Sequence, residues 1–87
     1  MTKYSVYTEA LRLDELKQVA RQHVSDCFSI HELNGCYKGV EEKSVVFEFI
    51  IDGNIDGSIS YFAETCKELN NQSTVLVTKE KVELEYV

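Results

Sequence analysis

Residues 34–51 read NGCYKGVEEKSVVFEFII, and this stretch decides the fold. Gly35 and Gly39 bracket an aromatic and a basic residue, and glycine adopts turn conformations that other residues resist. The stretch therefore predicts a sharp hairpin that presents Tyr37 and Lys38 near its tip. Recognition chemistry is expected to concentrate there, because exposed loops on a rigid scaffold commonly carry function.

The second half of this stretch, Lys43–Ile51, predicts a strand that is apolar on both faces. One face carries Val45, Phe47, Phe49 and Ile51, and the other carries Val46, Glu48 and Ile50. Such a strand is typical of a central position in a sheet that is covered on both sides. If the helices cover one side, Val46 and Ile50 are expected to form an oligomer interface on the other.

The rest of the chain supplies the remaining elements by its hydrophobic periodicity. We expect strands over Tyr4–Thr8, Phe28–Leu33, Thr74–Thr78 and Val82–Val87, a helix from about Asp14 to Ser25 with Asp14 as its N-cap, and a helix that begins after Asn54 or Asp56 and ends at Asn70-Asn71. The fold class predicted is α+β: a ferredoxin-like βαββαβ arrangement with an extra C-terminal strand and two helices on one face of an antiparallel sheet. The chain has no proline and we find no linker in it, so residues 1–87 are expected to form a single domain.

Charge excludes some partners. Fifteen acidic residues against nine basic ones give a net charge of −6, which argues against non-specific binding to nucleic acid or to an anionic membrane. The charge does not exclude a basic protein partner, and the alternate spacing of the acidic tail also fits the solvent face of a strand. Glu83 and Glu85, on one face of the predicted last strand, are the expected contacts for such a partner.

Three cysteines, Cys27, Cys36 and Cys66, are an odd number and form no C-x-x-C motif, so reduced thiols are expected. The first residues lack an apolar leader segment, and no apolar run approaches the roughly 20 residues of a membrane span. These features predict a cytoplasmic protein that neither is secreted nor spans a membrane.

No metal, cofactor or catalytic centre is predicted. The residues of a possible zinc site, His23, Cys27, His31 and Cys36, do not have the spacing of a structural site. Glu41 and Glu42 are adjacent on a strand and point to opposite faces, so they cannot act together on one bond. These patterns favour a non-enzymatic protein over an enzyme, without deciding between them.

Around the hairpin the chain resembles a loose group of small uncharacterised bacterial and phage proteins. The resemblance covers roughly residues 28–77 and is carried by Gly35, Tyr37, Lys38, Gly39, Glu42, Ser44, Gln72 and the run 73–77. Tyr37 stands where we would expect a tryptophan. No established activity comes with the group, so the resemblance implies a fold and a candidate site, and its association with phage genomes implies an accessory role in phage and host conflict.

Two functional hypotheses follow. The first is a non-enzymatic, homo-oligomeric binding protein, phage-derived and active against host defence, that sequesters a nucleotide-like ligand or occludes a host protein. In that hypothesis Tyr37 stacks on a base, Lys38 meets phosphate, and Glu42 and Gln72 orient the rest of the ligand. The alternative is a ferredoxin-like regulatory domain or small enzyme that binds a metabolite at a subunit interface. A purely structural hairpin, with Tyr37 packed on the sheet edge, remains open beside both.

Overall fold

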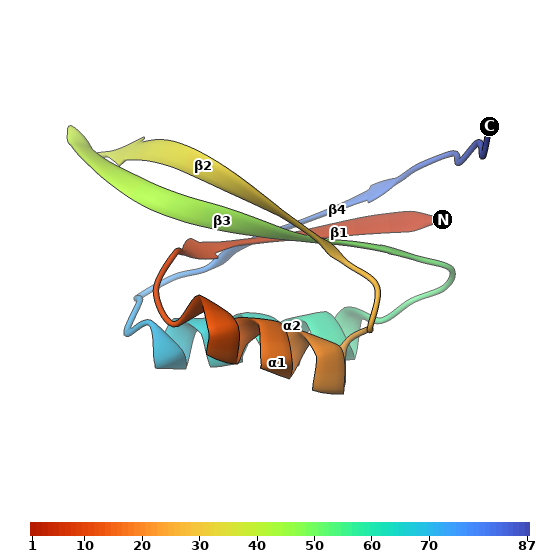
Figure 1. Cartoon of the computed structure of the whole chain (residues 1–87), viewed down its shortest axis with the longest axis horizontal. Helices are drawn as coiled ribbons and strands as arrows, with labels where there is room; N and C mark the ends of the chain where they lie inside the picture. The colour runs from red at the N-terminus through yellow and green to blue at the C-terminus, as the bar shows by residue number, and fades with distance from the viewer.

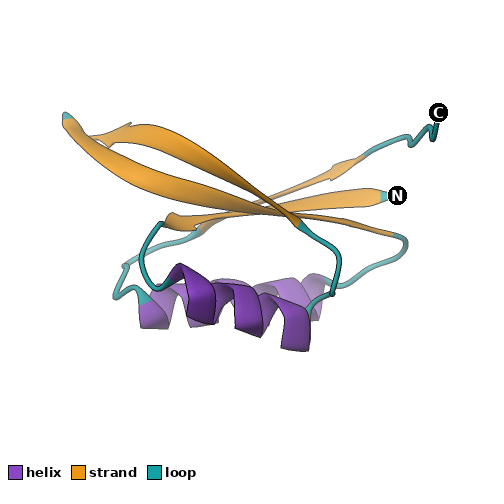
Figure 2. Ribbon diagram, in the orientation of Figure 1, coloured by secondary structure: helices purple, strands orange, loops and turns teal.

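The computed structural model of the chain describes residues 1–87, apart from the side chain of Tyr37. Its elements follow the order β1 (Thr2–Glu9), α1 (Leu13–His23), β2 (Ser29–Tyr37), β3 (Val40–Ile51), α2 (Asp56–Leu69) and β4 (Leu76–Lys81). The strands form one antiparallel sheet in the order β2-β3-β1-β4, and both helices lie on one face of it (Figures 1 and 2). The predicted βαββαβ arrangement and the two-helix layer are confirmed.

The core lies between the sheet and the helices, as the alternation in β3 predicts. Val45, Phe47 and Phe49 point toward the helices and are buried. Phe62 of α2 meets both phenylalanine rings edge-on, with centroids 5.0 Å from Phe47 and 5.7 Å from Phe49. Such edge-to-face pairs add to the stabilisation from burial, so this aromatic cluster fixes α2 on the sheet.

The extra C-terminal strand is a wrong prediction. The strand β4 continues through Lys79–Lys81, which lie between the two predicted strands, and residues 82–87 have no regular secondary structure. The predicted last strand does not form because β4 pairs with β1 only. The last pair of these two strands joins Lys81 to Thr2. Residues 82–87 extend past that pair and have no neighbouring strand in the same chain.

The start of α1 also differs from the prediction. The N-cap is Arg12, in a left-handed conformation with φ of 50°, and Asp14 lies in the first turn instead. An acidic residue in the first turn lies near the positive end of the helix dipole, which is a favourable position without being a cap. Neither α1 nor α2, the helices of the described chain, is long and apolar enough to cross a membrane.

Candidate ligand-binding site

The hairpin of β2 and β3 projects beyond the rest of the sheet. The strand β1 ends at Glu9, opposite Ser44, so residues 34–37 and 40–43 pair as strands only with each other, and one further backbone hydrogen bond joins the Ala10 N–H to the Lys43 carbonyl at 3.2 Å. Figure 1 shows the resulting ribbon reaching past the other strands at the end of the molecule away from both chain termini. The projecting hairpin is the one that the sequence predicts.

The turn at its tip is Lys38-Gly39, with φ of 50° and 80°. Two consecutive positive φ angles are typical of a type I′ turn, in which glycine and asparagine are favoured. Gly39 is needed for this turn, whereas Gly35 has no positive φ and a side chain there would meet only ordinary contacts. Lys38 is therefore a strained residue at an exposed tip, and strain of this kind clusters at functional positions.

A hollow of about 350 Å³ lies beside the base of this hairpin. It is lined by Glu9 at the end of β1, Glu42 on β3 and residues 71–74 of the loop from α2 to β4. We call it the hairpin-end hollow. Two of the predicted site residues, Glu42 and Gln72, thus line one hollow although they lie in different segments of the chain. Lys38 is not among its lining residues, and the predicted stacking of Tyr37 concerns a side chain outside the described residues.

Neighbouring hollows extend this concave surface around the end of β1. One of about 380 Å³ shares Glu9 and Glu42 and adds Lys43, which brings a positive charge next to the two carboxylates. Another of about 420 Å³ runs along the hairpin past Lys43 and Ser44. Ligand sites in proteins commonly have volumes from about 300 to 1,000 Å³, so the surface is large enough for a small molecule.

The wall formed by the α2–β4 loop is held by a set of hydrogen bonds that we call the Thr8 latch. The Thr8 hydroxyl donates to Gln72 Oε1 at 2.6 Å, and the Glu9 N–H donates to the same oxygen at 3.2 Å. The side-chain amide of Asn70 donates to Thr8 Oγ1 at 3.0 Å and to the Glu9 carbonyl at 3.1 Å. Since Thr8 and Asn70 are both buried, these bonds replace lost water contacts.

The latch gives Gln72 a structural role that its sequence position does not reveal. Its side-chain oxygen is occupied by the latch, which leaves its amide nitrogen as the group that can donate to a ligand. The neighbouring residue Asn71 has a φ of 52°, a conformation that asparagine tolerates better than most residues. The loop is therefore built to hold one shape beside the hollow.

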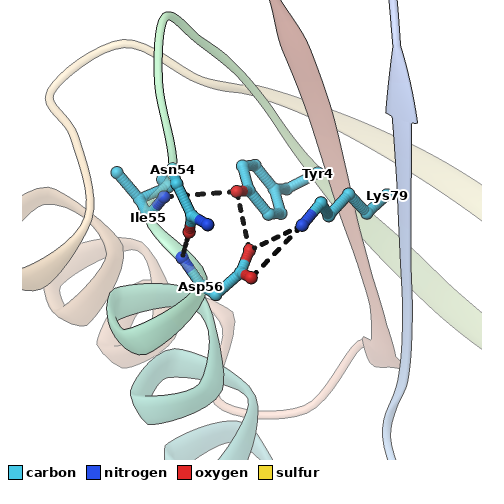
Figure 3. A network of polar contacts seen from close by, with 5 residues as sticks. All are labelled: Tyr4, Asn54, Ile55, Asp56 and Lys79. Carbon is cyan, nitrogen blue, oxygen red and sulfur yellow. Dashed lines mark hydrogen bonds and ion pairs between the residues drawn. The ribbon is translucent and has the colours of Figure 1, made fainter.

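A second polar network, which sequence reasoning missed, lies at the opposite end of α2 (Figure 3). The buried Tyr4 hydroxyl donates to Asp56 Oδ1 at 2.8 Å and accepts from the Ile55 N–H at 3.2 Å. Lys79 bonds both Asp56 oxygens at 3.2 Å, and the Asp56 N–H donates to Asn54 Oδ1 at 2.9 Å. The hydrogen bonds from Tyr4 and then from Lys79 lower the pKa of the Asp56 carboxyl. The network joins the start of α2 to β1 and β4; the one sequence signal for it is the turn residue Asn54 two positions before Asp56.

The two predicted interface residues lie on the face of the sheet opposite the helices, but they differ in exposure. Ile50 is 39% exposed, whereas Val46 is only 5% exposed and lies on the central strand β3 between Tyr7 of β1 and His31 of β2. Leu33 and Leu76 add exposed apolar surface to the same face. Of the two predicted residues, Ile50 is therefore the one that a second copy could contact directly.

The residues of the possible zinc site do not come together. His23 at the end of α1 packs its ring against Tyr61, while His31 of β2 contacts Glu48 at 3.3 Å on the far face of the sheet. No group of three or more potential metal ligands forms among the described residues. Cys27 and Cys36 are exposed thiols, whereas Cys66 is fully buried and burial raises its pKa to about 12.

Comparison with solved structures assigns the architecture. The chain superimposes on GlnK of B. subtilis, solved as a complex with ATP, with a TM-score of 0.65 over 91% of this chain and 80% of that one. The chain has the ferredoxin-like fold. Identity between the two is 13%, so the likeness concerns the fold alone. No protein-family model and no curated protein sequence matches the chain.

Proposed function

We propose that this chain is a small regulatory domain that binds a nucleotide or a related metabolite in the hairpin-end hollow and acts as a homo-oligomer. The observation that carries the proposal is the hollow itself, where Glu42 of the projecting hairpin faces the latched loop of Gln72. A concave site between a projecting hairpin and a rigid loop is a common setting for small-molecule recognition.

The likeness to GlnK supports nucleotides as the ligand class to test first. That structure contains ATP, and its fold extends over nearly all of this chain. The ligand belongs to GlnK, and its transfer to this chain is part of our proposal.

The chemistry of the hollow suits the polar parts of a nucleotide. The carboxylates of Glu9 and Glu42 can accept hydrogen bonds from ribose hydroxyls or from an exocyclic amino group, and Ser73 and Thr74 add hydroxyl groups. Phosphate would be repelled by the two carboxylates, so it would have to lie toward Lys43 in the neighbouring hollow. Lys38 as a phosphate contact and Tyr37 as a stacking platform stay part of the proposal.

Self-association is the second part of the proposal. The open face of the sheet carries exposed Ile50, Leu33 and Leu76, and a domain of 87 residues buries a limited core of its own. A second copy on this face would add apolar burial to a small core. The phage-derived and anti-defence parts of the first hypothesis gain no support from the comparisons and form no part of the proposed function.

Isothermal titration with ATP, ADP, AMP and GTP, each with and without Mg²⁺, tests the ligand class. The test variant is Glu42→Gln, and the matched control is Glu41→Gln, the exposed neighbour on the opposite side of β3. Removing a charge-assisted hydrogen bond costs about 1.5–3 kcal/mol, so Glu42→Gln should weaken binding about tenfold or more. Glu41→Gln should bind as the wild type does. Failure of every nucleotide to bind, or equal loss in both variants, would contradict the proposal.

A further inference from the structure

We propose that residues 77–87 form one continuous strand when two copies of the chain meet, pairing antiparallel about a two-fold axis at Val82. Each copy would then cover the free edge of β4 of the other with its C-terminal tail. The inference does not depend on the proposed ligand, and the interface is separate from the open face that carries Ile50.

The first observation is the free edge of β4. This strand lies at the end of the sheet, pairs with β1 on one side only, and has all six of its residues exposed. Val77, the first residue of the proposed strand, is 38% exposed. An edge strand with exposed apolar residues and unpaired backbone groups is a template for a further strand.

The second observation is the tail, which reads Val82-Glu83-Leu84-Glu85-Tyr86-Val87. Alternating acidic residues with valine, leucine and tyrosine are typical of a strand, yet in one chain the tail has no neighbour to pair with. Figure 1 shows it continuing from β4 and leaving the body of the molecule. A strand-forming segment and an unpaired edge are thus present in the same chain.

Backbone geometry restricts how the two segments can pair. The Val82 N–H donates to the Met1 carbonyl at 3.0 Å, so Val82 directs its backbone groups toward β1. The direction of the backbone N–H and C=O groups alternates along a strand, so these groups of Val77, Lys79 and Lys81 point toward the free edge. In an extended tail, the backbone groups of Glu83 and Glu85 point the same way. The residues that form hydrogen-bonded pairs between the two copies must therefore be these odd-numbered residues, each paired with an odd-numbered residue of the partner.

Charge then selects the register. With the axis at Val82, Lys81 lies opposite the partner's Glu83, Lys79 lies opposite the partner's Glu85, and Val77 lies opposite the partner's Val87. An axis at Lys81 would place that lysine against itself, and an axis at Glu83 would oppose two glutamates. Opposite charges across a strand pair are stabilising and like charges are destabilising, so the Val82 register is favoured over both. Lys79 already binds Asp56, and the partner's Glu85 would add a second carboxylate to it.

Disulfide trapping tests this geometry directly. In a Cys27→Ser/Cys36→Ser background, which removes the exposed thiols, Val82→Cys places the two new cysteines opposite each other on the axis. Directly opposite residues have Cβ atoms about 4.5–5.5 Å apart, and a non-hydrogen-bonded pair lies at the short end of that range, which meets the roughly 3.5–4.5 Å of a disulfide. Leu84→Cys is the matched control, because its two copies would be four residues out of register, about 13 Å apart along the strands.

Mild oxidation should give a covalent dimer with Val82→Cys and little dimer with Leu84→Cys. Equal trapping of both variants, or trapping of neither, would overturn the proposal. Adding Ile50→Lys to the Val82→Cys protein should leave the yield of covalent dimer unchanged. If Ile50→Lys abolishes the covalent dimer, dimerisation occurs through the open face instead.

A charge swap gives an independent test. Glu83→Lys should weaken dimerisation about tenfold in sedimentation equilibrium, because each dimer contains two affected pairs. The double variant Glu83→Lys/Lys81→Glu reverses both partners and should restore the wild-type affinity. Lys81 is chosen because Lys79 also holds Asp56. A double variant that stays as weak as the single one, or a wild type that is monomeric at every concentration, would refute the register.

Discussion

Replacing Thr8 by valine tests whether the Thr8 latch holds the α2–β4 loop on the sheet. Thr8 is 2% exposed, and its hydroxyl donates to Gln72 Oε1 at 2.6 Å and accepts from the Asn70 side chain at 3.0 Å. Valine has nearly the same shape, so the change removes both hydrogen bonds and opens little space. It also leaves polar atoms of Asn70 and Gln72 with fewer partners in a buried place.

The expected loss is about 2 kcal/mol of unfolding free energy, since each buried hydrogen bond contributes roughly 1 kcal/mol. For a domain of this size, that corresponds to a fall in Tm of about 8–16 °C. Thr8→Ser keeps the hydroxyl and loses one methyl group, which should cost about 1 kcal/mol or less.

Urea unfolding at equilibrium measures these differences, with Thr78→Val on the exposed strand β4 as the matched control. The control should change the unfolding free energy by less than about 0.5 kcal/mol. If Thr8→Val is as stable as the control, or if Thr8→Ser loses as much as Thr8→Val, the hydrogen bonds of the latch do not hold the loop.

Two further predictions concern groups that titrate. Burial and a pKa of about 12 should keep the Cys66 thiol unreactive. Thiol titration should therefore count two cysteines in the native protein and three after denaturation. Three thiols that react rapidly in the native protein would contradict the buried position of Cys66 on α2. The folded-state pKa of Asp56 lies below its ordinary value of 3.8, so its contribution to stability is present above that value and is lost as the pH falls through the lower folded pKa. Asp56→Asn should therefore reduce the dependence of Tm on pH between about pH 5 and pH 2, and an unchanged dependence would count against the network in Figure 3.

The fold could be predicted from the sequence where local pattern and tertiary packing agree. The alternation of Val45, Phe47 and Phe49 determines which face of β3 is buried, and Gly39 marks the hairpin turn. The prediction of a C-terminal strand was wrong because the tail has strand-forming residues but no partner strand in the chain. The periodicity of a sequence cannot reveal that a neighbouring strand is missing.

The candidate site could be predicted only in part. The sequence predicts both Glu42 and Gln72 as site residues, and both line one hollow in the structure. The latch could not be foreseen, because Thr8 and Gln72 are 64 positions apart and nothing local to either residue indicates the other. The same holds for Tyr4 and Asp56, which are 52 positions apart.

Native mass spectrometry of the purified protein, with and without added ATP, tests the central claim most directly. We expect an oligomer of the 10.0 kDa chain that gains the mass of bound nucleotide, with the gain reduced by Glu42→Gln and kept by Glu41→Gln. A 10.0 kDa monomer that takes up no nucleotide would contradict the account.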